Sequence, residues 1–132
     1  RLIEEEGDKF YKMTGDVSTK NNGGFIQFRA DLRNMNLSEN NFQGLRLLVR
    51  GNGESYNIHI RTGRTFIPWQ YYSVEFKTSK DWNEIIIPFN NFERSNFYQP
   101  RTFNSKDIAT LGIVAYGKDY QADIDLAKIE FY

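Results

Sequence analysis

The sequence predicts an all-β fold, an antiparallel β-sandwich of the jelly-roll type. Roughly seven or eight short segments alternate apolar and polar residues, and turn signals separate them at steady intervals. A third observation is the near absence of helical periodicity. Long polar connections at residues 33–43 and 90–106 suit crossovers from one sheet to the other. A closed barrel with similar strands stays open as an alternative.

Each expected strand follows from its own alternation. Residues 10–17 form the first, broken near Gly15, and residues 25–32 follow a glycine- and asparagine-rich turn. Residues 44–63 predict a hairpin, and residues 69–77 predict the next strand. A strand is expected at residues 85–89. Its hydrogen bonds to a neighbouring strand end at Pro88, which has no N–H to donate. The last expected elements are strands at residues 110–116 and 122–132, one helical turn at 105–109 capped by Ser105, and an acidic solvated tail at 1–8.

The predicted hairpin turns at Gly51-Asn52-Gly53, where at least one residue is expected to have a positive φ. Its apolar residues alternate toward a core: Leu45, Leu47 and Val49, then Tyr56, Ile58 and Ile60. Opposed residues of an antiparallel pair share a face. The opposite face is therefore expected to gather Arg46, Arg50, His59 and Arg61.

Three further groups are expected to extend this basic face. Tyr71 and Glu75 lie on the following strand, and Arg29 lies on an earlier one. Trp69, in the loop "FIPWQYY", is either a packed anchor or a contact to a partner. The candidate ligand-binding residues are thus Arg29, Arg46, Arg50, His59, Arg61, Trp69, Tyr71 and Glu75.

Two interpretations of the crowded cations stay open. The arginines can lie flat over aromatic surface and reach nearby carboxylates. Alternatively, the face is a concave site for an anionic or hydroxyl-rich ligand, which guanidinium groups bind in two-point geometry.

Composition excludes several classes of protein. The 132 residues, most simply one domain, carry 17 basic and 17 acidic side chains, and zero net charge argues against a nucleic-acid binder. No apolar run approaches the roughly 18 residues of a membrane span, and the residues given include no positively charged leader followed by an apolar core. The absence of cysteine excludes disulfides and thiolate metal sites. A soluble chain is expected, in either cytoplasm or periplasm.

The residues do not predict an enzyme or a cofactor. His59 lacks a recognisable nucleophile partner, and Glu75 lacks the second carboxylate that glycoside hydrolysis needs. No metal site is assigned. Asp119, Asp123 and Asp125 could hold a structural calcium ion, but alternate aspartates on a terminal strand are more typical of a solvated face.

An ordered set of segments carries a family resemblance. It comprises "NNGGFIQFR", "LRLLVRGNGESYNIHIRT", "YYSVEF", "WNEIIIPFNNF", "IATLGI" and "DIDLAKIEFY". This set resembles the complex I intermediate-associated protein family. The resemblance implies a galactose-binding-like jelly roll and a non-catalytic assembly factor, or chaperone, for respiratory NADH:ubiquinone oxidoreductase. Members usually carry a glycine-rich stretch with a serine before the position of Arg1, so a further upstream segment is expected.

Two functions follow as expectations. One is a protein-interaction module, possessing a basic, aromatic-edged sheet face that docks a partner such as a respiratory-complex subunit. The other is a carbohydrate-binding module that holds a sugar, or an acidic sugar, on a concave sheet. The predicted face offers more guanidinium groups than rings, which favours the first function.

Overall fold

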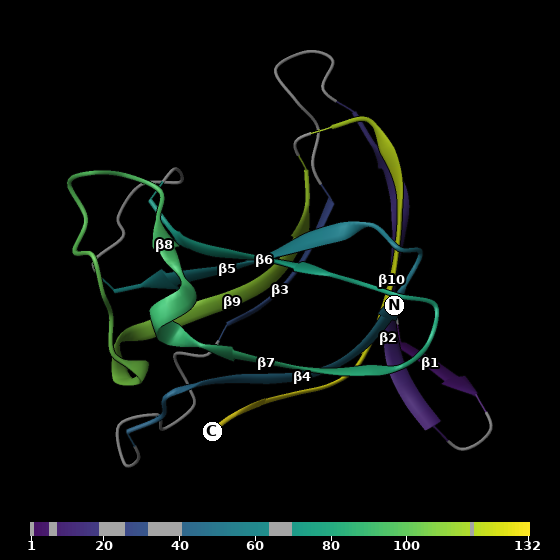
Figure 1. Ribbon diagram of the computed structural model, residues 1–132, viewed down its shortest axis with the longest axis horizontal. Coiled ribbons are helices and arrows are strands. Elements are labelled where there is room, and N and C mark those ends of the chain that lie inside the picture. Colours follow the sequence, from purple (N-terminus) through teal and green to yellow (C-terminus); the bar gives the residue numbers. More distant parts are fainter. Residues whose placement is uncertain (1, 6–7, 19–25, 32–40, 64–69, 117) are drawn as a thin grey trace.

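The computed structural model describes residues 2–5, 8–18, 26–31, 41–63, 70–116 and 118–132. Within these ranges the chain forms two five-stranded antiparallel sheets that lie as two layers (Figure 1). Across sheet A the order is β1 (Leu2–Glu5), β2 (Asp8–Val17), β10 (Tyr120–Phe131), β4 (Gly44–Gly51) and β7 (Asn83–Pro88). Across sheet B it is β3 (Ile26–Asp31), β9 (Ile108–Ala115), β5 (Ser55–Thr62), β6 (Tyr72–Lys77) and β8 (Glu93–Arg94). The predicted β-sandwich is confirmed.

Two local predictions need correction. Residues expected in a solvated tail form β1, which pairs with β2 so that Ile3 lies opposite Phe10. The short helical turn η3 (Ser105–Asp107) forms where a turn was predicted, but Ser105 does not cap it. Its Oγ instead accepts a hydrogen bond from the backbone N–H of Phe42 at 3.3 Å, so the hydroxyl is occupied outside the turn.

The predicted hairpin at residues 44–63 is wrong. Strand β4 pairs with β10 and β7, whereas β5 pairs with β6 and β9, so the two arms belong to different sheets. Residues 52–54 form a corner between the layers rather than a turn within one layer. The alternation fits both arrangements, since each arm presents one apolar face to the core in either case.

Hydrogen bonds to three other segments hold the corner in place. The N–H of Gly51 donates to the carbonyl of Ser79 at 2.7 Å, and the N–H of Asn52 donates to the carbonyl of Asp123 at 3.2 Å. The Asn52 side chain accepts from the buried Tyr56 hydroxyl at 2.8 Å. Gly53 has a φ of +86°, as expected for the turn, although the turn joins two sheets.

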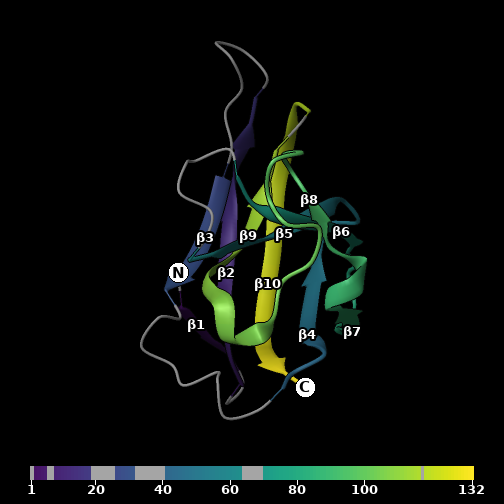
Figure 2. The same cartoon turned by 90° about the vertical axis from the view of Figure 1, so that its left-hand side faces the viewer.

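One core fills the space between the sheets. Leu45, Leu47 and Val49 of β4 face it from one side, and Ile58 and Ile60 of β5 face it from the other. At one end, rings from the turn η2 (Phe89–Asn91) and the connections beside it close the sandwich: Phe89, Phe92 and Phe103. Figure 2 faces this end of the molecule. No helix among the described residues is long and apolar enough to cross a membrane.

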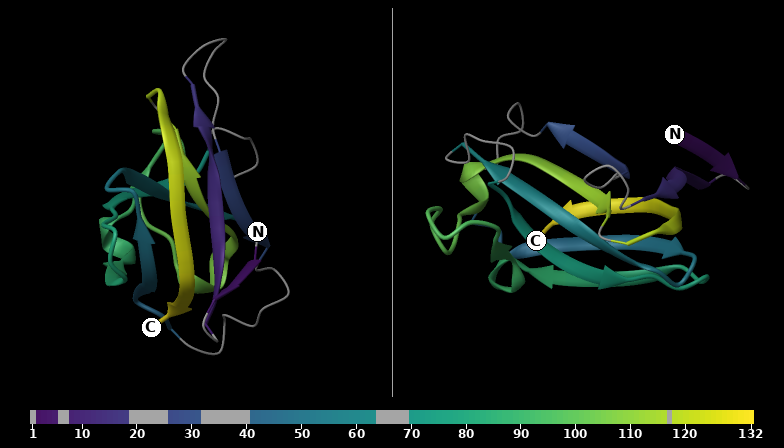
Figure 3. Two further views of the ribbon diagram at one scale, coloured as in Figure 1. Left: turned by 90° about the vertical axis from the view of Figure 1, so that its right-hand side faces the viewer. Right: turned by 90° about the horizontal axis from the view of Figure 1, so that it is seen from above.

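A network of charged groups covers the outer face of sheet A. Strand β10 lies between β2 and β4, as Figure 3 shows, and this places Asp125 between Lys12 and Arg50. The Asp125 side chain is only 6% exposed and lies 2.9 Å from Lys12 Nζ and 2.7 Å from Arg50 Nε. The Arg50 guanidinium also packs on Phe10 and Trp82, at 5.0 and 4.5 Å from the ring centroids. Trp82 therefore packs on the outer face of sheet A.

Gly44 sits where two segments of backbone approach closely. A Cβ at this position would lie 2.7 Å from the Tyr132 hydroxyl and 2.8 Å from Pro88 Cα, and would also contact the Ile87 carbonyl. We expect Gly44→Ala to lower the free energy of unfolding by about 1–3 kcal/mol, because backbone must shift to admit the methyl group. Urea denaturation measures the change. Gly63→Ala is the control, since a Cβ there meets nothing within 4 Å; equal losses in both variants would contradict the interpretation.

Asp125 is the anion that neutralises two cations on sheet A. We expect Asp125→Ala to destabilise the fold by about 2–3 kcal/mol, less than for a fully buried pair because Lys12 and Arg50 are partly exposed. Asp123→Ala is the matched control. Its side chain is 48% exposed and contacts Lys12 at 3.1 Å, so the expected loss is about 0.5 kcal/mol. Thermal and urea unfolding of both variants would detect the difference; similar losses would argue against the network.

Candidate functional site

The structure separates the predicted site residues onto opposite faces of the sandwich. Arg46 and Arg50 belong to β4 of sheet A, whereas His59 and Arg61 belong to β5 of sheet B. The prediction of one patch for these four residues is therefore wrong, because the corner at residues 52–54 turns the polar faces of the two arms in opposite directions. Whether any of them binds a ligand stays a prediction.

The remaining predicted residues relate to sheet B. Glu75 of β6 lies opposite Asn57 of β5, and Tyr71 immediately precedes β6. Arg29 of β3 is in register with Gly112 of β9, which is itself in register with His59. Trp69 lies outside the described residues, so its predicted role is untested.

The sheet A arginines interact with carboxylates of the same chain. Arg46 donates to Glu130 Oε1 at 3.2 Å and lies 3.6 Å from Glu84 Oε1. The hydrogen bond from Arg46 holds the pKa of Glu130 below its usual value. Arg50 is bound by Asp125 and packed between rings, as described above. These two arginines therefore lie as the first of the two interpretations expects, over the sheet and paired with acids.

A cluster of rings and one guanidinium group lies on the outer side of sheet B. We call His59, Arg61, Tyr71 and Tyr116 the His59 cluster. The imidazole of His59 stacks on the ring of Tyr71, with centroids 4.2 Å apart and planes at 16°. Tyr116 meets His59 edge-on at 5.5 Å, and the Arg61 guanidinium lies 5.8 Å from the Tyr71 centroid. Arg61 also donates to the Gln70 carbonyl at 3.3 Å, which fixes its position.

His59 is neutral at physiological pH. Burial, and then the positive charge of Arg61, lower the pKa of His59 to about 4. Its Nε2 atom is buried and has no hydrogen-bond partner among the described residues. An imidazolium ion would leave a buried N–H without an acceptor, which agrees with the low pKa. His59 is thus suited to stacking rather than to proton transfer near neutral pH.

Tyr116 supplies the exposed edge of the His59 cluster. It directly follows β9 and is 38% exposed, although one side packs on His59. Burial of its hydroxyl, together with the neighbouring Tyr71 and Glu75, raises the pKa of Tyr116. The expected strand at residues 110–116 included Tyr116, which was given no site role. The available signal was the alternation along the strand: Tyr116 is an even number of residues from Gly112, the residue in register with His59.

The described residues do not assemble a metal centre. No group of three or more histidine, aspartate or glutamate side chains is positioned there to hold an ion. Asp123 and Asp125, considered above as calcium ligands, both contact Lys12 Nζ instead.

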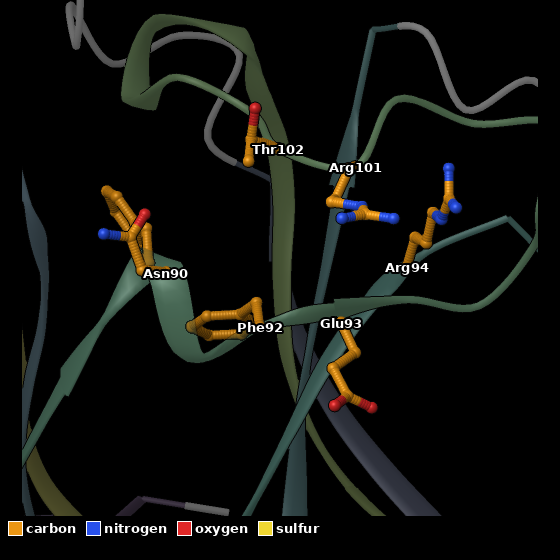
Figure 4. Close-up of a pocket in the computed structure, with 7 residues that line it drawn as sticks. Asn90, Phe92, Glu93, Arg94, Arg101 and Thr102 are labelled. Carbon is orange, nitrogen blue, oxygen red and sulfur yellow. The ribbon is translucent and has the colours of Figure 1, made fainter.

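A pocket of about 450 Å³ lies at a different place, where the edges of the two sheets meet. It was not predicted, because residues 90–106 had no strand or helix periodicity. Figure 4 shows its lining residues from η2, β8 and the following loop: Phe89, Asn90, Phe92, Glu93, Arg94, Arg101 and Thr102. The sequence signal that could have indicated the pocket was the high density of aromatic and arginine side chains within residues 90–106.

Solved structures with the same fold include carbohydrate-binding modules. A family 11 module from Clostridium thermocellum, in complex with a beta-1,3-1,4-mixed-linked tetrasaccharide, is 16% identical, with a TM-score of 0.64 over 99% of this chain and 86% of that chain. A family 30 carbohydrate-binding module is 13% identical, with a TM-score of 0.69 over 100% of this chain and 83% of that chain. At such identities the similarity concerns the fold alone. A search of curated proteins finds no match.

Sequence-family comparison is more specific. The family described as Complex I intermediate-associated protein 30 (CIA30) matches residues 2–127. The match runs from β1 into β10 and so includes strands of both sheets. The chain therefore belongs to the complex I intermediate-associated protein 30 family.

Proposed function

We propose that this chain is a non-catalytic binding module that docks a protein partner through the outer side of sheet B. Membership of the CIA30 family supports a partner among the subunits of respiratory complex I and its assembly intermediates. The observation that carries the proposal is the His59 cluster, in which two tyrosine rings, an imidazole and a guanidinium group adjoin one another on this side. Tyrosine and arginine are the residues most enriched at energetic centres of protein interfaces.

The cluster is suited to being covered by a partner. Stacking and the hydrogen bond to Gln70 hold Tyr71 and Arg61 in place, so little side-chain entropy remains to be lost on binding. His59 is neutral, and covering a neutral ring avoids the cost of removing an ion from water. Glu75 and Lys77 are exposed on β6, the strand that follows Tyr71, and would form a polar rim around the cluster.

Carbohydrate binding is the second candidate. The fold shared with carbohydrate-binding modules and the rings of the His59 cluster favour it. However, His59 and Arg61 both pack on Tyr71, so part of the ring surface that a sugar would stack on is already occupied. This contact favours the protein partner.

A photo-crosslinking phenylalanine at position 71 tests the proposed docking face. We expect irradiation in cell extract to join it to a complex I subunit or assembly factor, identified by mass spectrometry. Arg61→Ala should weaken binding of that purified partner about five- to thirtyfold, corresponding to about 1–2 kcal/mol.

The same crosslinker at Ile86 is the positional control, because Ile86 is exposed on β7 of sheet A. Equal capture of the partner from both positions would contradict docking through sheet B.

A glycan array should give no binding. Micromolar binding to an oligosaccharide that Tyr71→Ala abolishes would replace the proposal with the carbohydrate function.

The lowered pKa of His59 makes a second test possible. The unfolded chain protonates histidine near pH 6.5, whereas the folded chain does so only near pH 4, so protons favour unfolding between these values. We expect the wild type to lose stability relative to His59→Phe as pH falls from about 6.5 to about 4, with a constant difference outside this window. Urea unfolding across the pH range measures it. If the stabilities of the wild type and His59→Phe run parallel over the whole pH range, the pKa of His59 is the same in the folded and unfolded chains.

A further inference from the structure

The pocket at residues 89–102 occupies the open edge of the sandwich. Strand β7 ends sheet A and β8 ends sheet B, and η2 connects these two edges. The pocket therefore opens where the core approaches the surface between the layers. Its volume of about 450 Å³ falls within the range of small-ligand sites, which is enough for one side chain.

The apolar part of the pocket is an extension of the core. Phe89 and Phe92 line it, and both pack on Phe103, with centroids 5.2 and 5.9 Å apart. Since these rings are fixed by one another, the apolar surface is preformed. A ligand that covers it would gain the free energy of apolar burial without reorganising the site.

Cations form the other wall. Figure 4 shows the Arg94 and Arg101 side chains on one side of the pocket, while Glu93 points away from them. Among the described residues, no carboxylate lies within ion-pair distance of either guanidinium group. An apolar surface beside two such cations is complementary to a ligand that carries an apolar group next to a carboxylate.

The loop beyond the pocket has a fixed shape. Arg94 Nη1 donates to the carbonyls of Phe97 and Gln99, at 3.3 and 3.2 Å. The buried Gln99 donates in turn to the Tyr71 carbonyl at 2.9 Å, and the Tyr72 hydroxyl donates to the Pro100 carbonyl at 2.6 Å. The loop is thus anchored to sheet B at several points.

This fixed loop exposes two aromatic rings. Phe97 is 81% exposed and Tyr98 is 88% exposed, and the Arg94 guanidinium lies 5.1 Å from the Phe97 centroid. The apolar surface therefore continues from the pocket past Arg94 onto the loop. Adjacent exposed rings beside a guanidinium group are typical of protein interfaces.

We propose that the pocket and the 95–99 loop form a second binding site, distinct from the His59 cluster, for an acidic peptide segment of a partner protein. An apolar side chain of the segment packs against Phe89 and Phe92 where they line the pocket. A neighbouring aspartate or glutamate pairs with Arg101, and the rest of the segment passes over Phe97 and Tyr98. This site goes beyond the proposed function and does not depend on the identity of the partner at sheet B.

Phage display of random short peptides against the whole chain tests the proposal. We expect enriched sequences to place an acidic residue beside an aromatic or large aliphatic residue. One enriched peptide, labelled with fluorescein, should bind Arg101→Glu at least about tenfold more weakly than the wild type. Lys80→Glu makes the same charge change at an exposed turn outside the pocket and is the matched control, which should bind like the wild type.

Exchanging the charges of the peptide and of residue 101 gives a sharper test. The peptide with lysine in place of its acidic residue should bind Arg101→Glu more tightly than it binds the wild type. The proposal is overturned if no peptide is enriched, or if Arg101→Glu binds the enriched peptide as the wild type does. It is also overturned if free phenylacetate displaces the peptide at equal affinity, or if sedimentation detects a dimer of this chain that Arg101→Glu dissociates.

Discussion

The strands β4 and β5 are consecutive in the chain, yet they bury their apolar residues in one core from opposite sides. The rest of the structure depends on this shared burial. Leu47 and Ile58 are both fully buried only because the corner at Asn52 carries the chain from one layer to the other. Hydrogen bonds from Asn52 to β10 and from Tyr56 to Asn52 stabilise that corner, so that its position follows from the strands around it.

Shared burial also decides which charges can act together. On sheet A, each arginine of β4 reaches an acid of β10, and Asp125 and Glu130 therefore help to hold the sheet rather than a ligand. On sheet B, β5 presents His59 and Arg61 beside Tyr71, which precedes β6, and Tyr116, which follows β9. The backbone carbonyl of Tyr71 accepts hydrogen bonds from the backbone N–H of Ser95 and from the side-chain amide of Gln99. The two candidate surfaces are consequently neighbours connected through one residue.

The amino-acid sequence predicts the fold class and most strands, because period-two alternation is a local property of residues such as Leu45 to Val49. It does not predict which strands become neighbours. Alternation is identical for a hairpin and for a sandwich corner, so the patch that included Arg46 and His59 was assembled from the wrong pairing. The pocket at Phe92 and Arg101 was missed for a related reason: it is formed by the meeting of two sheet edges, and no local pattern encodes that meeting.

The placement of β10 affects how the protein is made. This strand separates β2 from β4 in sheet A, although a ribosome synthesises it after every other described strand. Until it emerges, β2 and β4 have unpaired edges and the core lacks Ile124 and Leu126. Sheet A therefore cannot close until β10 has been synthesised, and until then those edges are open to pairing with other chains.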